Sequence, residues 1–143
     1  MVRHYKIILT VDEDNRWSLD RQTWLYGVES RDLDVDLIRY KYEQYAERAK
    51  EIRSKVKKLL GAMLKNRKTG YLRIEGYHQG FGFDSVLLHL NIRSSGEFVE
   101  YREGEERIYD FNKAFKLFER QLNAIVEELH SRYWQIVKQA VAC

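Results

Sequence analysis

Two histidines and an aspartate form the best candidate in this chain for metal binding or acid–base chemistry. His78 and His89 flank a glycine-containing turn, and Asp84 lies between them in the sequence. A histidine pair that meets across neighbouring strands can transfer protons or hold a cation, because imidazole titrates near neutral pH. Neither histidine stands in a ligand spacing such as His-x-His or His-Glu-x-x-His. We therefore interpret them as ordinary strand residues and expect no metal.

Other motifs with catalytic associations are incomplete. The glycines between residues 76 and 82 lack the Gly-Lys-Ser/Thr of a phosphate-binding loop and do not open a helical pattern, which favours hairpin turns. Residues 93–96 and 99–101 faintly resemble the central hairpin of RelE-type ribonucleases. Among the enzyme interpretations, a ribonuclease of this type is the least unlikely. Those folds end on a strand, whereas this chain ends on a long helical pattern. The sequence predicts a non-catalytic protein without a cofactor.

Basic residues are more informative. Residues 34–68 contain eleven Lys or Arg against five acids, and every one of those acids precedes position 52. A stretch without acids suits phosphate oxygens, so it is a candidate nucleic-acid interface. The alternative is a solvated helix face whose bases favour the negative C-terminal end of the helix dipole. The candidate residues of this stretch are Lys55, Lys57, Lys58, Lys65, Arg67 and Lys68.

The chain has two stretches whose apolar residues recur at alternating intervals of four and three residues, and most of these bases lie in the first of them. This spacing predicts long helices over about residues 35–66 and 110–141. Asp32 or Asp34 is expected to cap the first helix, and Gly70 to end it in the left-handed conformation. The first stripe consists of Ile38, Tyr42, Tyr45, Ala49, Ile52, Val56, Leu59 and Met63, and the second of Phe111, Phe115, Phe118, Leu122, Ile125 and Leu129.

Alternating apolar residues predict the strands. They cover residues 3–11, 71–78, 83–93, 98–102 and 107–110, and the last four are joined by short connections. Short connections favour antiparallel pairing. Residues 15–31, which include Trp17 and Trp24, have no sustained periodicity, so both a short helix and an irregular loop remain open.

These elements predict one α+β domain over residues 1–143, in the order β-α-β-β-β(-β)-α, with two long helices packed on one face of an antiparallel sheet. A helix of about 30 residues is about 45 Å long, against about 20 Å for a strand, so each helix must overhang the sheet. We expect residues 56–63 and 129–140 to overhang. Their apolar side chains need burial against each other or in a homodimer. The simpler alternative is that both stripes only cover the sheet.

Composition limits the class of protein. The chain has 143 residues, a formal net charge of +3 and 44% hydrophobic residues, which is typical of a folded protein rather than a disordered one. Its only cysteine, Cys143, excludes an internal disulfide and fits a reducing compartment. No apolar run approaches the roughly 18 residues of a membrane span. We expect a cytoplasmic protein with no membrane partner.

Residues 86–122 resemble the C-terminal half of the ribosome hibernation factor family. The similarity lies in LLHLN, in GEFVEYREGEERIYDFNKAFKLFERQL and in the order of the elements, with Tyr109 near the family's tyrosine and residues 118–122 at its Leu-Glu-Arg-Gln-Leu ending. Phe118 replaces the first leucine, and residues 15–31 have no counterpart in that family. The resemblance implies a non-catalytic factor that binds the RNA of the small ribosomal subunit through basic surfaces.

The last helix adds two further candidate residues. A double-stranded RNA-binding domain also has the order helix, three strands, helix, and Lys113 and Lys116 lie where that module has its phosphate-binding lysines. Its glycine-proline-histidine loop is absent. The sequence thus favours binding to structured RNA or the small ribosomal subunit, possible homodimerisation, and translational silencing. The alternative is a dimeric interaction or inhibitor protein of a virus or mobile element, acting through helical arms and the aromatic-rich segment 17–26.

Overall fold

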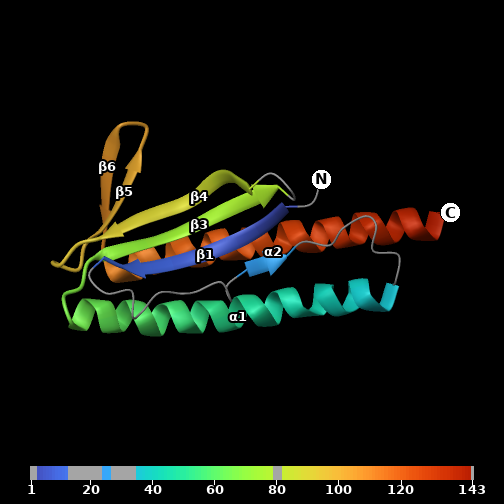
Figure 1. Ribbon diagram of the computed structural model, residues 1–143, viewed down its shortest axis with the longest axis horizontal. Coiled ribbons are helices and arrows are strands. Elements are labelled where there is room, and N and C mark those ends of the chain that lie inside the picture. Colours follow the sequence, from blue (N-terminus) through green and yellow to red (C-terminus); the bar gives the residue numbers. More distant parts are fainter. Residues whose placement is uncertain (1–2, 13–23, 27–34, 79–81, 143) are drawn as a thin grey trace.

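The computed structural model describes residues 3–12, 24–26, 35–78 and 82–142 and has the α+β architecture expected from the sequence (Figure 1). One sheet is accompanied by two long helices. In chain order the elements are β1 (Arg3–Val11), β2 (Trp24–Tyr26), α1 (Val35–Lys65), β3 (Gly70–His78), β4 (Gly82–Ile92), β5 (Phe98–Arg102), β6 (Glu105–Tyr109) and α2 (Phe111–Ala142).

The sheet has six strands in the order β2-β1-β3-β4-β5-β6, and every neighbouring pair is antiparallel. The strand β2 was not predicted: it covers three residues and pairs with β1, with Leu25 opposite Tyr5. Of the segment left open above, only this strand, which includes Trp24, lies within the described residues. Trp17 lies outside them.

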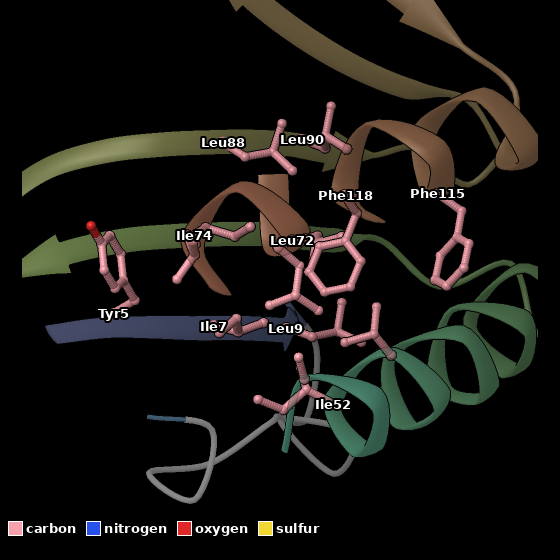
Figure 2. Close-up of a cluster of buried hydrophobic side chains, with 14 of the residues drawn as sticks. Tyr5, Ile7, Leu9, Ile52, Leu72, Ile74, Leu88, Leu90, Phe115 and Phe118 are labelled. Carbon is pink, nitrogen blue, oxygen red and sulfur yellow. The ribbon is translucent and has the colours of Figure 1, made fainter. Parts of the chain in front are cut away.

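Alternate residues of the central strands point to the helices and form the core. Ile7 lies opposite Ile74, and Ile74 lies opposite Leu88, so one face of the sheet presents a continuous apolar layer. Figure 2 shows these side chains directed toward Ile52 of α1 and Phe118 of α2. Both helices therefore pack on the same face of the sheet, as expected, because only that face carries a full set of buried hydrophobes.

The two helices run antiparallel and extend beyond the sheet at one end (Figure 1). The predicted overhang of residues 56–63 is wrong. Val56, Leu60 and Met63 are at most 1% exposed, so this half packs in the core and the N-terminal half of α1 overhangs instead. Within the described residues, neither helix is apolar enough to cross a membrane.

The end of α1 also differs from expectation. Arg67, not Gly70, takes the left-handed conformation, with a φ of 51°. Its N–H donates to the Leu64 carbonyl at 3.2 Å and the Lys68 N–H donates to the Met63 carbonyl at 2.9 Å, which is the hydrogen-bond pattern of a Schellman cap. Gly70 is already the first residue of β3, where a Cβ atom would lie 1.9 Å from the Thr10 carbonyl oxygen. Glycine is needed there for close strand approach.

Helix α2 begins with a side-chain cap. The Oδ1 atom of Asp110 accepts a hydrogen bond from the backbone N–H of Lys113 at 2.9 Å, which satisfies one of the free backbone N–H groups of the first turn. The predicted caps of α1, Asp32 and Asp34, lie outside the described residues.

Candidate nucleic-acid interface

The register of the sheet separates the two histidines. His78 pairs with Gly82, whereas His89 lies opposite Arg73, five residues earlier on β3. At about 3.3 Å per residue the two histidines are about 16 Å apart along the strands. The two histidines therefore do not meet across the strands, because the antiparallel register pairs each of them with another residue. Among the described residues, no group of three or more His, Cys, Asp or Glu is placed to hold a metal ion.

On the face of the sheet opposite the helices, polar side chains interact with one another. The Tyr71 ring stacks on His89 with 5.3 Å between ring centroids. Glu75 lies 3.3 Å from the Arg73 Nε atom and accepts a hydrogen bond from the Tyr77 hydroxyl at 3.1 Å. Burial, together with this hydrogen bond to a carboxylate, raises the pKa of Tyr77 above its ordinary value. The Glu75 carboxylate thus already interacts with both Arg73 and Tyr77.

The predicted basic residues of α1 lie at the surface. All are exposed except Lys68, which is half-buried. Within the described residues, no carboxylate lies at ion-pair distance from Lys55, Lys57, Lys58, Lys65 or Arg67. Their positive charge is therefore not neutralised by these described acids, as an interface for a polyanion requires.

Helix geometry divides these bases between two sides of α1. At 3.6 residues per turn, Lys55 and Lys57 point about 160° apart around the helix axis. Lys55 and Lys58 line a shallow hollow with Glu47 and Glu51, so acids that precede the basic stretch in sequence lie beside it in space. Lys57 points instead toward α2. The positive charge of this stretch is thus divided between two sides of α1, and on one side acids lie beside it.

A groove between α1 and α2 brings predicted bases of both helices together. It is an open cavity of about 440 Å³ on the helical side of the molecule. Lys57 of α1 and Lys116 of α2 both line it, because the C-terminal half of α1 runs beside the N-terminal half of α2. Its other lining residues are Arg53, Ser54, Phe111, Asn112, Phe115 and Glu119.

Contacts within the groove hold its basic side chains in place. The Lys57 ammonium lies 5.7 Å from the centre of the Phe115 ring, within the range of a cation–π contact. The Arg53 Nε atom lies 3.8 Å from a carboxylate oxygen of Glu119, in an ion pair that bridges the two helices. Lys116 has no such partner among the described acids. The positive end of the α2 dipole, one turn away, adds to the local positive potential.

The remaining predicted residues lie outside the groove. Lys113 is exposed in the first turn of α2, one turn before Lys116. Lys65 lies in the last turn of α1, and Arg67 and Lys68 follow in its C-terminal cap. These residues extend the basic surface but do not line the groove.

Sequence reasoning missed the polar and aromatic residues that complete the groove. Arg53 was counted among the bases of the helix but was not named as a candidate, although it too follows the last acid, Glu51, and Asn112 and Ser54 carry no charge. The available signal was helical spacing: Arg53 and Lys57 are four residues apart, as are Asn112 and Lys116. That signal becomes informative only once the two helices are known to be antiparallel neighbours.

Comparison with known proteins gives no relative from which a role can be transferred. No protein-family model matches the chain, no curated protein matches it, and no solved structure matches it.

Proposed function

We propose that this protein is a non-catalytic RNA-binding protein that holds phosphates on the basic surface formed by α1 and the start of α2. The observation that carries the proposal is the meeting of Lys57 and Lys116, from two helices, in one groove. Bases that contact phosphates contribute to the affinity for a polyanion, because each neutralised phosphate releases condensed counterions. Lys65 and Arg67 add exposed positive charge at the C-terminal end of α1, and Lys58 adds it on the neighbouring side of the helix.

The proposed partner is structured RNA, with the RNA of the small ribosomal subunit as the first choice. The resemblance of residues 86–122 to ribosome hibernation factors supports this choice. It also suggests translational silencing in the cytoplasm as the biological role. Binding would need no cofactor and no chemical step.

A matched pair of double variants tests the proposal. Lys57→Glu with Lys116→Glu reverses two charges at the groove, and Arg102→Glu with Arg107→Glu reverses two exposed charges on the β5–β6 hairpin, which projects away from the helices (Figure 1). Both variants change the net charge equally. Binding to ribosomal RNA is measured by fluorescence anisotropy over a series of salt concentrations, with co-sedimentation on small subunits beside it.

We expect the groove variant alone to bind RNA more weakly. The slope of log affinity against log salt should fall by about 1, because the phosphate contact that Lys57 and Lys116 share is lost. Equal loss in both variants would indicate only a general charge effect and would refute the assigned surface. Absence of salt-dependent binding by the wild-type protein would refute RNA binding altogether.

A homodimer formed through the overhanging helix ends is the second candidate function. Tyr40 in the first two turns of α1 is 58% exposed, and Trp134 in the C-terminal third of α2 is 51% exposed. Large exposed aromatics are enriched in protein interfaces. Light scattering distinguishes this function: a dimer that persists at high salt and is lost with Trp134→Glu would support it.

A further inference from the structure

The groove between α1 and α2 has dimensions that suit one small group and not a duplex. Its volume of about 440 Å³ falls within the range of about 300–1,000 Å³ typical of small-molecule sites. A double helix can contact Lys57 and Lys116 at the edge of the groove, but it is too wide to enter the space between the two protein helices. An unpaired nucleotide can enter.

The floor of the groove is aromatic. Phe111 and Phe115 both line it, with rings 6.0 Å apart and only 4° from parallel. Phe111 is half-buried and keeps part of its surface open at the groove. Phe115 is only 7% exposed and has the Lys57 ammonium over its ring, so it supports Phe111 from the core side. Unpaired bases bind proteins largely through contact with aromatic rings, which a sugar-phosphate backbone cannot exploit. Such a floor therefore favours a base over a phosphate.

The rim of the groove supplies the polar groups that a nucleotide needs. Lys57 and Lys116 stand on opposite helices and can bind one phosphate between them. The Asn112 amide and the Ser54 hydroxyl donate and accept hydrogen bonds, as the edge of an unpaired base requires.

An acid on the rim restricts how the RNA lies. Glu119 lines the groove and is bridged to Arg53. Its carboxylate repels a second phosphate but accepts a hydrogen bond from an exocyclic amine of a base. This arrangement is unfavourable for a backbone that runs along the whole groove, and it is compatible with a single nucleotide turned into it.

We propose that the groove binds one unpaired nucleotide of the RNA, with its phosphate between Lys57 and Lys116 and its base against Phe111. This inference rests on the proposed RNA binding and specifies the feature of the RNA that is recognised. Bulges, loops and single strands present such a nucleotide, whereas a perfect duplex does not.

Three fluorescently labelled RNAs test the inference by anisotropy. They are a perfect hairpin, the same hairpin with one bulged nucleotide, and a single strand with the same number of phosphates. We expect the bulged hairpin and the single strand to bind about tenfold more tightly than the perfect hairpin, because contact of one base with aromatic rings has about this effect.

A variant that fills the groove without changing charge completes the test. Ser54→Trp places an indole at the rim, and Ser94→Trp places one in the exposed turn between β4 and β5 as the matched control. Ser54→Trp should abolish the preference for the bulge and retain binding to the perfect hairpin, and Ser94→Trp should change neither. Asn112→Trp, at another exposed groove position, serves as a second blocking variant if Ser54→Trp lowers the melting temperature.

The possible outcomes separate this inference from the proposed function. If the wild-type protein binds none of the three RNAs, both are refuted. If it binds all three equally and the blocking variants change nothing, RNA binding stands and the nucleotide site is refuted. A preference for the bulge that is lost only in the groove variants supports the site.

Discussion

The hydroxyl of Tyr5 in β1 donates a hydrogen bond to Glu128 of α2 at 2.5 Å, although 123 residues separate the two in sequence. The same carboxylate accepts a hydrogen bond from Arg132 at 2.9 Å, through its other oxygen. Because Tyr5 is fully buried, its hydroxyl cannot turn to water instead. This contact attaches the first strand to the last helix.

Replacement of Tyr5 by phenylalanine should therefore destabilise the protein without changing its fold. We expect a loss of about 2 kcal/mol in the free energy of unfolding, as is usual for a hydrogen bond to a charged group. The measurement is urea denaturation followed by circular dichroism. Tyr40→Phe, at a position 58% exposed, is the control and should remain within about 0.5 kcal/mol of wild type. Equal stability of the two variants would contradict a role for the Tyr5–Glu128 bond.

Two glycines should respond in opposite directions to alanine. At Gly70 the new methyl group would lie 1.9 Å from the Thr10 carbonyl oxygen, so β1 and β3 must separate. We expect a loss of about 3 kcal/mol or more. At Gly61, on the exposed side of α1, a Cβ atom has nothing within 4 Å, and alanine should add about 1 kcal/mol of stability through its higher helix propensity. Thermal unfolding of both variants checks the pair, and a tolerated Gly70→Ala would refute the close strand approach.

The raised pKa of Tyr77 predicts a loss of stability in alkali. The folded protein retains the phenol proton above pH 10.0, where the unfolded chain releases it. The stabilisation is therefore fully present below that pH and is lost as the pH rises through the folded-state pKa. Tyr77→Phe should show a shallower fall of unfolding free energy as the pH rises above about 10. Tyr40→Phe is again the control, and identical slopes for Tyr77→Phe and wild type would contradict the raised pKa.

Elements that depend on local pattern were predicted closely. Apolar spacing placed the second helix at about residues 110–141, and it covers Phe111–Ala142. Strand β1 was predicted at residues 3–11 and covers Arg3–Val11. Both predictions succeed because periodicity is a property of neighbours in sequence. Strand β2 was missed, since three residues carry no period and it forms only by pairing with the edge of β1.

The candidate interface was predicted only in part. The bases of α1 and α2 were visible in the sequence, but the meeting of Lys57 with Lys116 follows from the antiparallel packing of two helices far apart in the chain. The same packing brings in Arg53 and Asn112, which no charge pattern distinguishes. The separation of His78 and His89 has a related cause: the strand register is set by long-range pairing, which sequence spacing alone does not reveal.

The amino-acid sequence by itself determined the helices, five of the six strands, the apolar side of each and the basic character of α1, because hydrophobic periodicity and charge are local properties. Only the tertiary structure decided which residues face one another. Packing of both helices on one sheet face selected the half of α1 that overhangs, the glycine that must lie against Thr10, and the few bases that line a shared groove. These outcomes depend on contacts between distant segments, which become defined only when the core forms.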